Sequence, residues 1–308
     1  MDAFDSAFYG FRNDARELGT SSPNYPRSFL RNVLPIPCHS HNDYWRTTPL
    51  YSALGTGCIS VEADVWIVDE VTYVGHTDSD LDRSVNGTLE KLYINPLIEI
   101  LEARNFARTS ENHRPFNGVF AVEPTQSLTL LIDIKSEGYQ TWPLVSKALE
   151  PLRQRGWLEY WNGEERVPGP ITVVGTGNTP FASVMENDTY RDMFMDAPLD
   201  MLESDEDRPG SKEYKFNRSN SHYASTRLSK AVGMVGPKLS PGQTEILRTQ
   251  IRQAHERGLL PRYWGTPRWP RGLRDQIWEV LVKENIGLLN VDDLRAVRKG
   301  HWGVWPHQ

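Results

Sequence analysis

The sequence has few cysteines, no long apolar segment and no excess of positive charge. Its two cysteines among 308 residues are too few for the disulfide framework of a small secreted domain. It contains no run of about 18 apolar residues, so we expect no transmembrane segment. Lys and Arg total 34 against 40 Asp and Glu, and the two signs are interspersed. Nucleic acid is therefore not expected as a partner.

The N-terminal segment also lacks the features of a signal peptide. It reads MDAFDSAFYGFRND, which is acidic and polar, without a basic start or an apolar stretch. We expect a soluble protein, and the sequence leaves open whether it stays in the cytoplasm or is secreted after removal of a leader.

Short apolar runs recur along the chain and are separated by segments in which apolar residues follow helical spacing. The runs cover residues 33–41, 59–68, 128–135, 171–177, 192–198, 222–229, 259–265 and 286–293. Alternation of strand and helix indicates parallel pairing with crossover helices. We expect one (β/α)8 TIM barrel over residues 33–300, with an N-terminal arm (1–32) and a C-terminal tail (301–308). An open doubly wound sheet is the alternative.

The two cysteines lie in the first two of these runs, which we expect to be neighbouring strands. Two buried thiols are the favoured interpretation, because free cysteine behaves as a small apolar residue. A disulfide between Cys38 and Cys58 is the alternative.

The first run ends in CHSHNDY, a dense set of metal ligands and proton carriers. In a barrel, the C-terminal ends of the strands form the active site. His39 and His41 stand two residues apart and so share one side of the strand. They are candidate catalytic residues, with a satisfied structural pair as the alternative.

The second run carries two carboxylates, Glu62 and Asp64, on one face of an otherwise apolar strand. If that face is the barrel interior, their repulsion costs several kcal/mol unless a cation neutralises it. A hard divalent ion bound through oxygen, Mg²⁺ with Ca²⁺ as the alternative, would do so. One carboxylate facing solvent at an edge is the other interpretation.

Two further segments contribute to the same rim. His76 follows a turn at Asp69-Glu70 and a second extended piece that can fold back beside the first. Asp133 and Lys135 share one face of the apolar run LTLLIDIK. We expect Asp133 to complete the metal ligands and Lys135 to meet an anionic group of the substrate.

This inventory favours phosphodiester chemistry. A metal and a lysine stabilise charge on phosphoryl oxygens, while one histidine acts as base and another as acid. A two-carboxylate glycosidase is disfavoured by the number of histidines. Two alternatives remain: a metal-dependent acid–base lyase or cyclase acting on a small metabolite, and a non-enzymatic binding module.

The pattern H…ExD…H…DxK resembles the phospholipase-C-like phosphodiesterase superfamily, which includes glycerophosphodiester phosphodiesterases and sphingomyelinase D toxins. HSHNDYW, SVEADVW and VGHT are similar to the fungal family called altered inheritance of mitochondria protein 6, across the whole length. The resemblance implies a TIM barrel, a phosphate-binding Lys135 and His76 as the second catalytic histidine. It also implies a metal-ligand set of Glu62, Asp64 and Asp133.

The resemblance extends to three further positions. The toxin pattern H-x-x-N fits His39 with Asn42, which favours His39 over His41 as the first catalytic histidine. Trp264 stands where the superfamily often has an aromatic residue in the pocket wall, with a core position as the alternative.

Two departures bear on the substrate. His-Arg-Gly followed by Glu-Asn-Thr is absent after His39, which argues against a glycerophosphodiester. Neither cysteine lies beyond His76, so the disulfide-closed loop of the toxins is absent. We expect a phosphoric diester hydrolase or a phospholipase D-like lyase acting on a small-molecule or lipid phosphodiester.

Several remaining residues have simpler interpretations. Gly175-Thr176-Gly177-Asn178 is an incomplete nucleotide motif. Structural roles are favoured for three residues near later strand ends, namely His222, Asn290 and Asp292. Surface positions are the simplest interpretation of His113, His255, His301 and His307.

Overall fold

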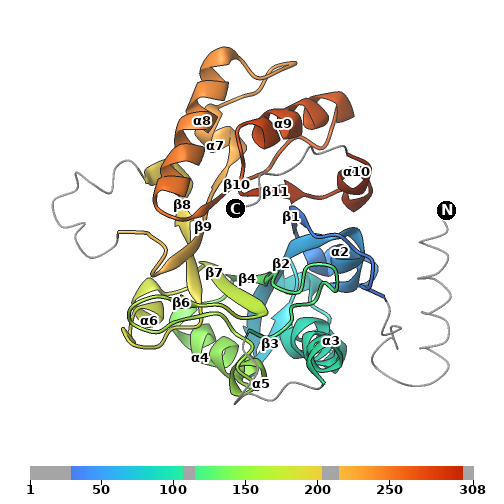
Figure 1. Ribbon diagram of the computed structural model, residues 1–308, viewed down its shortest axis with the longest axis vertical. Helices are drawn as coiled ribbons and strands as arrows, with labels where there is room; N and C mark the ends of the chain where they lie inside the picture. The colour runs from blue at the N-terminus through green and yellow to red at the C-terminus, as the bar shows by residue number, and fades with distance from the viewer. Residues whose placement is uncertain (1–28, 107–114, 203–214, 301–308) are drawn as a thin grey trace.

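The computed structural model describes residues 29–106, 115–202 and 215–300, and its centre is a closed parallel barrel (Figure 1). In spatial order from β2, the barrel strands are β2 (Cys58–Val68), β4 (Leu128–Ile134), β7 (Ile171–Gly177), β8 (Phe194–Pro198), β9 (Ser221–Arg227), β10 (Leu260–Trp264), β11 (Leu288–Val291) and β1 (Ile36–Ser40). The pairing of β1 with β2 closes the ring. The (β/α)8 prediction is confirmed, and each barrel strand falls within or beside its predicted run.

Helices surround the barrel, and Figure 1 shows α8 and α9 on one side of it and α3 and α4 on the opposite side. Their bounds are α2 (Tyr51–Thr56), α3 (Asn95–Asn105), α4 (Gly138–Ala148), α5 (Glu150–Gln154), α6 (Phe181–Val184), α7 (Leu228–Val232), α8 (Pro241–Glu256), α9 (Arg271–Lys283) and α10 (Leu294–Lys299). Short 3₁₀ helices are η1 (Asp43–Trp45), η2 (Asp78–Asp80), η3 (Val85–Gly87) and η5 (Leu199–Met201), and η4 (Glu90–Ile94) is a π-helix that leads into α3. Helix α8 begins with a capping box and buries Leu247, Ile251 and Ala254 at helical spacing.

Two hairpins mark the opposite ends of the barrel. β3 (Val71–Val74) pairs antiparallel with the end of β2. The turn between them places Asp69 and Glu70 at φ 50° and 62°, the left-handed conformation of a two-residue hairpin turn. This hairpin returns the chain toward the C-terminal ends of the barrel strands. The second hairpin, β5 (Tyr160–Trp161) with β6 (Arg166–Val167), precedes β7 and lies near the N-terminal ends of the strands.

Inside the barrel, the side chains of Leu131, Val174, Tyr223 and Leu288 pack into one buried cluster. Inward positions nearer the C-terminal ends of β2 and β4 carry acidic residues instead. The apolar cluster therefore fills the barrel below the acidic residues, and the hydroxyl of Tyr223 is its one polar side-chain group.

The expectation of two buried thiols is wrong, because Cys38 and Cys58 form a disulfide. Their Cα atoms are 4.8 Å apart on the neighbouring strands β1 and β2. The sequence indicated that these strands are neighbours. It did not determine the register that brings the two sulfurs within bonding distance.

Within the described ranges, no helix combines the length and apolar character needed to cross a membrane. Most of the predicted arm (1–28) and the tail (301–308) lie outside the described residues, as do His113, His301 and His307.

We predict that the double variant Cys38→Ala/Cys58→Ala is less stable than the wild type. The bridge joins residues separated by 20 positions, and closing a loop of that size removes about 3 kcal/mol of chain entropy from the unfolded state. Urea unfolding of both proteins measures the difference. Equal midpoints and slopes would show that the disulfide does not stabilise the fold.

Candidate active site

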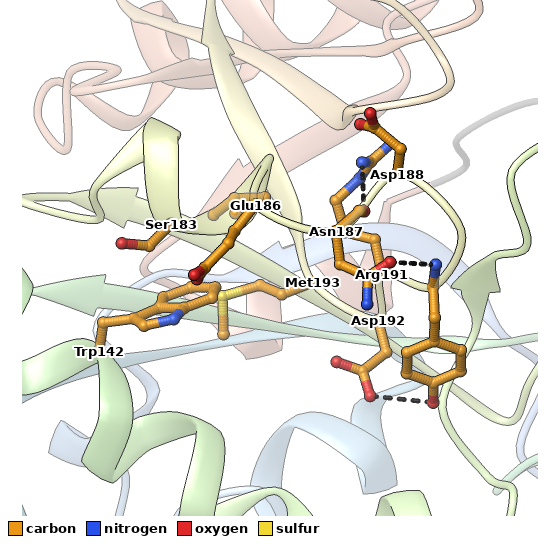
Figure 2. A pocket seen from close by; sticks show the side chains of 10 residues that line it. Trp142, Ser183, Glu186, Asn187, Asp188, Arg191, Asp192 and Met193 are labelled. Carbon is orange, nitrogen blue, oxygen red and sulfur yellow. Dashed lines mark hydrogen bonds between the residues drawn. The ribbon is translucent and has the colours of Figure 1, made fainter.

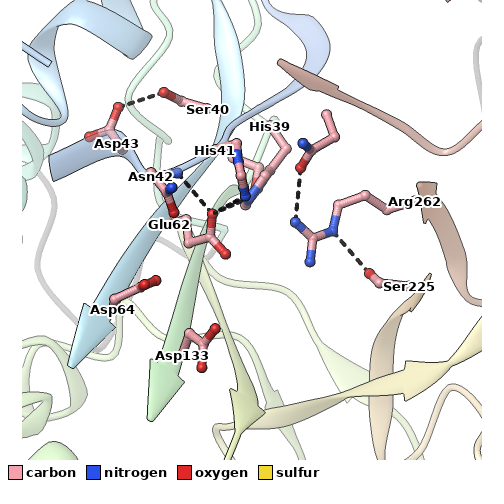
Figure 3. A network of polar contacts seen from close by, with 12 residues as sticks. His39, Ser40, His41, Asn42, Asp43, Glu62, Asp64, Asp133, Ser225 and Arg262 are labelled. Atoms are coloured by element: carbon pink, nitrogen blue, oxygen red, sulfur yellow. Dashed lines mark hydrogen bonds and ion pairs between the residues drawn. The ribbon is translucent and has the colours of Figure 1, made fainter. Parts of the chain in front are cut away.

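Three carboxylates from two adjacent strands converge at the C-terminal end of the barrel (Figure 3). Glu62 and Asp64 alternate with apolar residues along β2, and Asp133 lies directly beside Asp64 in the register of β2 with β4. One oxygen from each of the three lies within 4.8 Å of the others. The structure therefore brings together the three residues that the sequence predicted as metal ligands.

The three carboxylates of this acidic cluster, Glu62, Asp64 and Asp133, repel one another when all are ionised. Burial raises the pKa of Asp64 to about 6, and the charge of Glu62 adds to the effect while Lys135 opposes it. The Lys135 ammonium lies 3.0 Å from Asp64 Oδ2 and 2.6 Å from Asp133 Oδ2. One lysine thus offsets only part of the negative charge.

The donor set fits a hard divalent cation. Asp64 Oδ1 and Asp133 Oδ1 are both buried and accept no hydrogen bond within the described part of the chain. A buried carboxylate oxygen without a partner is costly, and a cation coordinated through oxygen removes that cost. These residues could therefore hold a metal ion, while the identity of the metal stays a prediction.

Two imidazoles and one backbone amide face Glu62 from β1 and the turn that follows it. The Nε2 atoms of His39 and His41 lie 3.5 and 3.8 Å from Glu62 Oε2, and Asn42 donates its backbone N–H to the same oxygen at 2.9 Å. Asn42 adopts a left-handed conformation with φ 48°, which turns its N–H toward the carboxylate.

The surroundings of the two imidazoles differ. His39 is fully buried, and burial followed by the charge of Arg262 lowers its pKa to about 4. The side chain of His41 is 20% exposed, and its Nδ1 atom lies 2.8 Å from Asp292 Oδ1. Both predicted histidines therefore reach Glu62, but only His41 has an acidic partner at its second nitrogen among the described residues.

His76 lies on the other side of the acidic cluster. Its Nδ1 is 3.4 Å from Asp64 Oδ2, and its side chain is 47% exposed. The Tyr44 hydroxyl donates to Asp64 at 2.9 Å and lies 3.3 Å from the same ring nitrogen of His76. Trp45, which is 54% exposed, packs its ring 5.0 Å from the His76 ring. Neither aromatic residue was predicted to have a role, although both belong to the HSHNDYW phrase.

A second buried ion pair lies in the barrel interior beside the histidines. Arg262 on β10 donates to Asp196 at 3.2 Å, to Ser225 at 2.9 Å and to Asn290 at 3.0 Å. Burial raises the pKa of Asp196 despite the charge of Arg262. An arginine within the apolar strand LPRYW was the signal that could have revealed this pair, because a buried arginine needs acceptors.

Gly177, at the end of β7, leaves the space that Asp133 occupies. Its φ is +65°, and a Cβ atom there would lie 2.0 Å from Asp133 Oδ1. The next residue, Asn178, donates to the backbone oxygens of Lys135 and Ser136. The glycine-containing GTGN segment therefore supports the acidic cluster.

The remaining residues named in the sequence analysis differ in how close they lie to the acidic cluster. Trp264 is 37% exposed with Arg227 over its ring, so the core alternative is wrong, while its role in a pocket wall stays a prediction. Asp292 and Asn290 both contact site residues. His222 lies near the N-terminal end of β9 and contacts Arg166, far along the strand from the rim.

A pocket of about 430 Å³ lies elsewhere, beside α6 and the segment that leads into β8 (Figure 2). It is lined by Trp142, Ser183, Val184, Glu186, Asn187, Asp188, Tyr190, Arg191, Asp192 and Met193. Its Asp192 pairs with Arg153, and its Arg191 donates to backbone oxygens. The pocket shares no residue with the acidic cluster, and we assign it no role.

The fold is a (β/α)8 barrel with a candidate metal site at one rim, and a family match adds the phosphodiesterase class. Residues 27–196, which include β1, β2 and β4, match the family model of the AIM6-like phosphodiesterase domain. No solved structure matches the chain significantly.

Curated relatives agree with the family model. "Altered inheritance of mitochondria protein 6 homolog" from Arthroderma benhamiae is 42% identical over 89% of this chain and 86% of its own length. "Altered inheritance of mitochondria protein 6" from Eremothecium gossypii is 37% identical over 85% of this chain and 68% of its own. The protein of the same name from Candida glabrata is 32% identical over 94% and 76%. The chain belongs to the altered inheritance of mitochondria protein 6 family.

We predict that Gly177→Ala weakens divalent-ion binding by at least tenfold, because its methyl group would displace Asp133. Gly233→Ala is the matched control, since Gly233 has a similar φ of +73° and a methyl group added there would meet no atom within 4 Å. Calorimetric titration with Mg²⁺ compares the variants. Equal affinities would show that Asp133 does not depend on the glycine.

We also predict that Asp64→Asn stabilises the protein at pH 7.5 when a chelator is present. The pKa of about 6 in the folded state exceeds the usual value of ~3.9, so stability falls as pH rises between these values. The amide removes this penalty of about 1–3 kcal/mol at pH 7.5, and the gain shrinks toward pH 4.

Urea unfolding at both pH values measures the effect, with the exposed Asp78→Asn as the control. An Asp64→Asn protein that is less stable than the wild type at pH 7.5 would contradict the proposed charge repulsion.

Proposed function

We propose that this protein is a metal-dependent phosphodiesterase that uses histidines for proton transfer. The observation that carries the proposal is the convergence, at one rim, of the acidic cluster with Lys135 and three imidazoles. The family model supports the phosphodiesterase class. The metal and the residue roles are our inference from the site geometry.

The acidic cluster would hold the divalent ion, which supplies positive charge to the phosphoryl oxygens when bound. Lys135 is anchored by Asp64 and Asp133 and offers its ammonium to the same anionic group. Burial would lower the pKa of Lys135, but the two carboxylates outweigh it and raise the pKa. The lysine therefore stays charged and binds the substrate rather than moving a proton.

The proton-transfer groups are imidazoles that lie beside two different carboxylates of the cluster. One of these imidazoles is His39 or His41, beside Glu62, and the other is His76, beside Asp64. In this proposal the phosphorus atom of the substrate lies between them. One imidazole removes the proton from the attacking oxygen, and the other gives a proton to the leaving oxygen. The attacking oxygen belongs to water in hydrolysis and to a substrate hydroxyl in cyclisation.

The aromatic residues at the rim favour a substrate with an apolar group. Trp45 is more than half exposed beside His76, where it can contact the substituent on one ester oxygen. A lysophospholipid-like diester provides such a group, and a small aryl diester mimics it.

We test this with bis(p-nitrophenyl) phosphate and lysophosphatidylcholine, each with Mg²⁺ and with a chelator. We expect Mg²⁺-dependent release of product and a loss of at least 10–100-fold for Asp133→Asn. Glu245→Gln, an exposed acid on α8, serves as the control.

Full turnover by Asp133→Asn, or no cleavage of any phosphodiester by folded wild type, would overturn the proposal. Activity confined to phosphate-free compounds would favour a lyase or cyclase instead.

A further inference from the structure

Two imidazoles at the same oxygen of Glu62 cannot both be explained by one acid–base role. The hydrogen bonds behind His39 distinguish them. These bonds run from the rim through the barrel interior to the hairpin at its N-terminal end.

The rim half of this chain consists of hydroxyl groups. His39 Nδ1 lies 2.6 Å from Ser60 Oγ on β2. The Tyr223 hydroxyl, from β9 across the barrel, lies 2.7 Å from the same Ser60 oxygen. Tyr223 in turn forms a side-chain hydrogen bond with Thr129 on β4.

The other half ends on an arginine. Thr129 Oγ1 lies 3.4 Å from His222 Nε2, and His222 Nδ1 lies 2.8 Å from the Arg166 guanidinium. Arg166 also contacts Glu159 and donates to the Ser221 and Arg218 backbone oxygens, which fixes its position.

The arginine fixes the direction of the hydrogen bonds at its own end of the chain. A guanidinium donates and never accepts, so His222 Nδ1 is the acceptor and the proton of His222 resides on Nε2. That N–H then donates to Thr129. The Tyr223 hydroxyl donates to Ser60, which leaves the Ser60 hydrogen for His39 Nδ1, and Thr129 donates to Tyr223 in the same direction.

The far end of the chain agrees with this direction. An unprotonated Nδ1 places the His39 proton on Nε2, which lies 3.5 Å from Glu62 Oε2 and has no hydrogen-bond partner among the described residues, so the N–H faces a carboxylate that only accepts. The reverse direction would require Ser60 to donate to Tyr223, whereas the Tyr223 hydroxyl donates to Ser60. It would also leave a neutral His39 with a lone pair aimed at the carboxylate.

We propose that this chain, from Arg166 to His39, holds the His39 ring with its Nε2–H directed at Glu62, which it positions, and that His41 is the imidazole that exchanges protons with the substrate. The division of roles rests on the proposed function. It departs from the sequence-based preference for His39, which the resemblance supported.

The surroundings of His41 suit this role. Asp292 lies 2.8 Å from its Nδ1, and Arg268 and Arg46 hold Asp292 through its side chain and backbone oxygen. A carboxylate at Nδ1 orients an imidazole and stabilises the proton that it gains. The ring is also partly exposed, so its Nε2 can reach a bound substrate.

The first test reads the tautomer directly. ¹⁵N–¹H spectra of ¹⁵N-histidine-labelled wild type, without substrate, should show His39 with a protonated Nε2 and a bare Nδ1. Tyr223→Phe should alter the His39 signals, because it removes one link. Tyr263→Phe should leave them unchanged, since the buried Tyr263 hydroxyl bonds to Gln250 outside the chain.

The second test separates metal binding from turnover. His39→Gln offers an amide N–H near the original Nε2, so it should reduce Mg²⁺ affinity and kcat by less than His39→Ala, which we expect to lose 10–100-fold in affinity. His41→Gln should lower kcat by about 10²–10⁴-fold with Mg²⁺ affinity nearly unchanged.

A proton on Nδ1 of His39 would overturn the proposal. So would a His39→Gln loss in kcat equal to that of His41→Gln at unchanged Mg²⁺ affinity. If the wild type cleaves no phosphodiester, the proposed function and the His41 role fail, whereas the spectra still decide the role of His39.

Discussion

Repulsion among three carboxylates in a buried space is the constraint on which the rest of this site depends. Like charges at this separation, removed from water, are unfavourable unless cations and hydrogen-bond donors surround them. The described residues provide Lys135 at Asp64 and Asp133, and three nitrogen groups at Glu62. Within the described part of the chain, one oxygen each of Asp64 and Asp133 has no hydrogen-bond donor, which is the feature expected of a cation site.

The barrel makes this concentration of charge tolerable because its strands fix the ligands rigidly. Parallel pairing places Asp64 beside Asp133. The long strand β2 continues into a hairpin with β3, and His76 follows β3 and lies beside Asp64. Gly177 provides the space that Asp133 needs, since its missing side chain would occupy the carboxylate position. Packing and the geometry of the candidate metal site are thus coupled at the ends of the same strands.

The polar residues in the barrel interior extend this coupling to the opposite end of the molecule. Arg262 and Asp196 form a buried pair next to the histidines, and Tyr223 links Ser60 to residues below the apolar cluster. In a barrel of this size, interior side chains are usually apolar. A continuous polar path through such an interior fixes hydrogen positions at the rim, which a solvent-exposed site would leave free.

The sequence by itself determined the number and order of the barrel strands and the identity of the acidic cluster. Both follow from local periodicity, because alternation along a strand decides which residues share a face. Glu62 with Asp64, and Asp133 with Lys135, were readable for that reason. The resemblance added the family, which the comparisons confirm.

Tertiary structure alone decided how the strands meet. The register of β1 with β2 joins Cys38 to Cys58, and the curvature of the barrel brings Tyr223 to Ser60 and Asp292 to His41. These contacts span 20 to 251 residues of sequence and depend on closure of the ring, which no local pattern records. The sequence therefore named two histidines on one side of a strand, and only the folded barrel gave each a different set of partners.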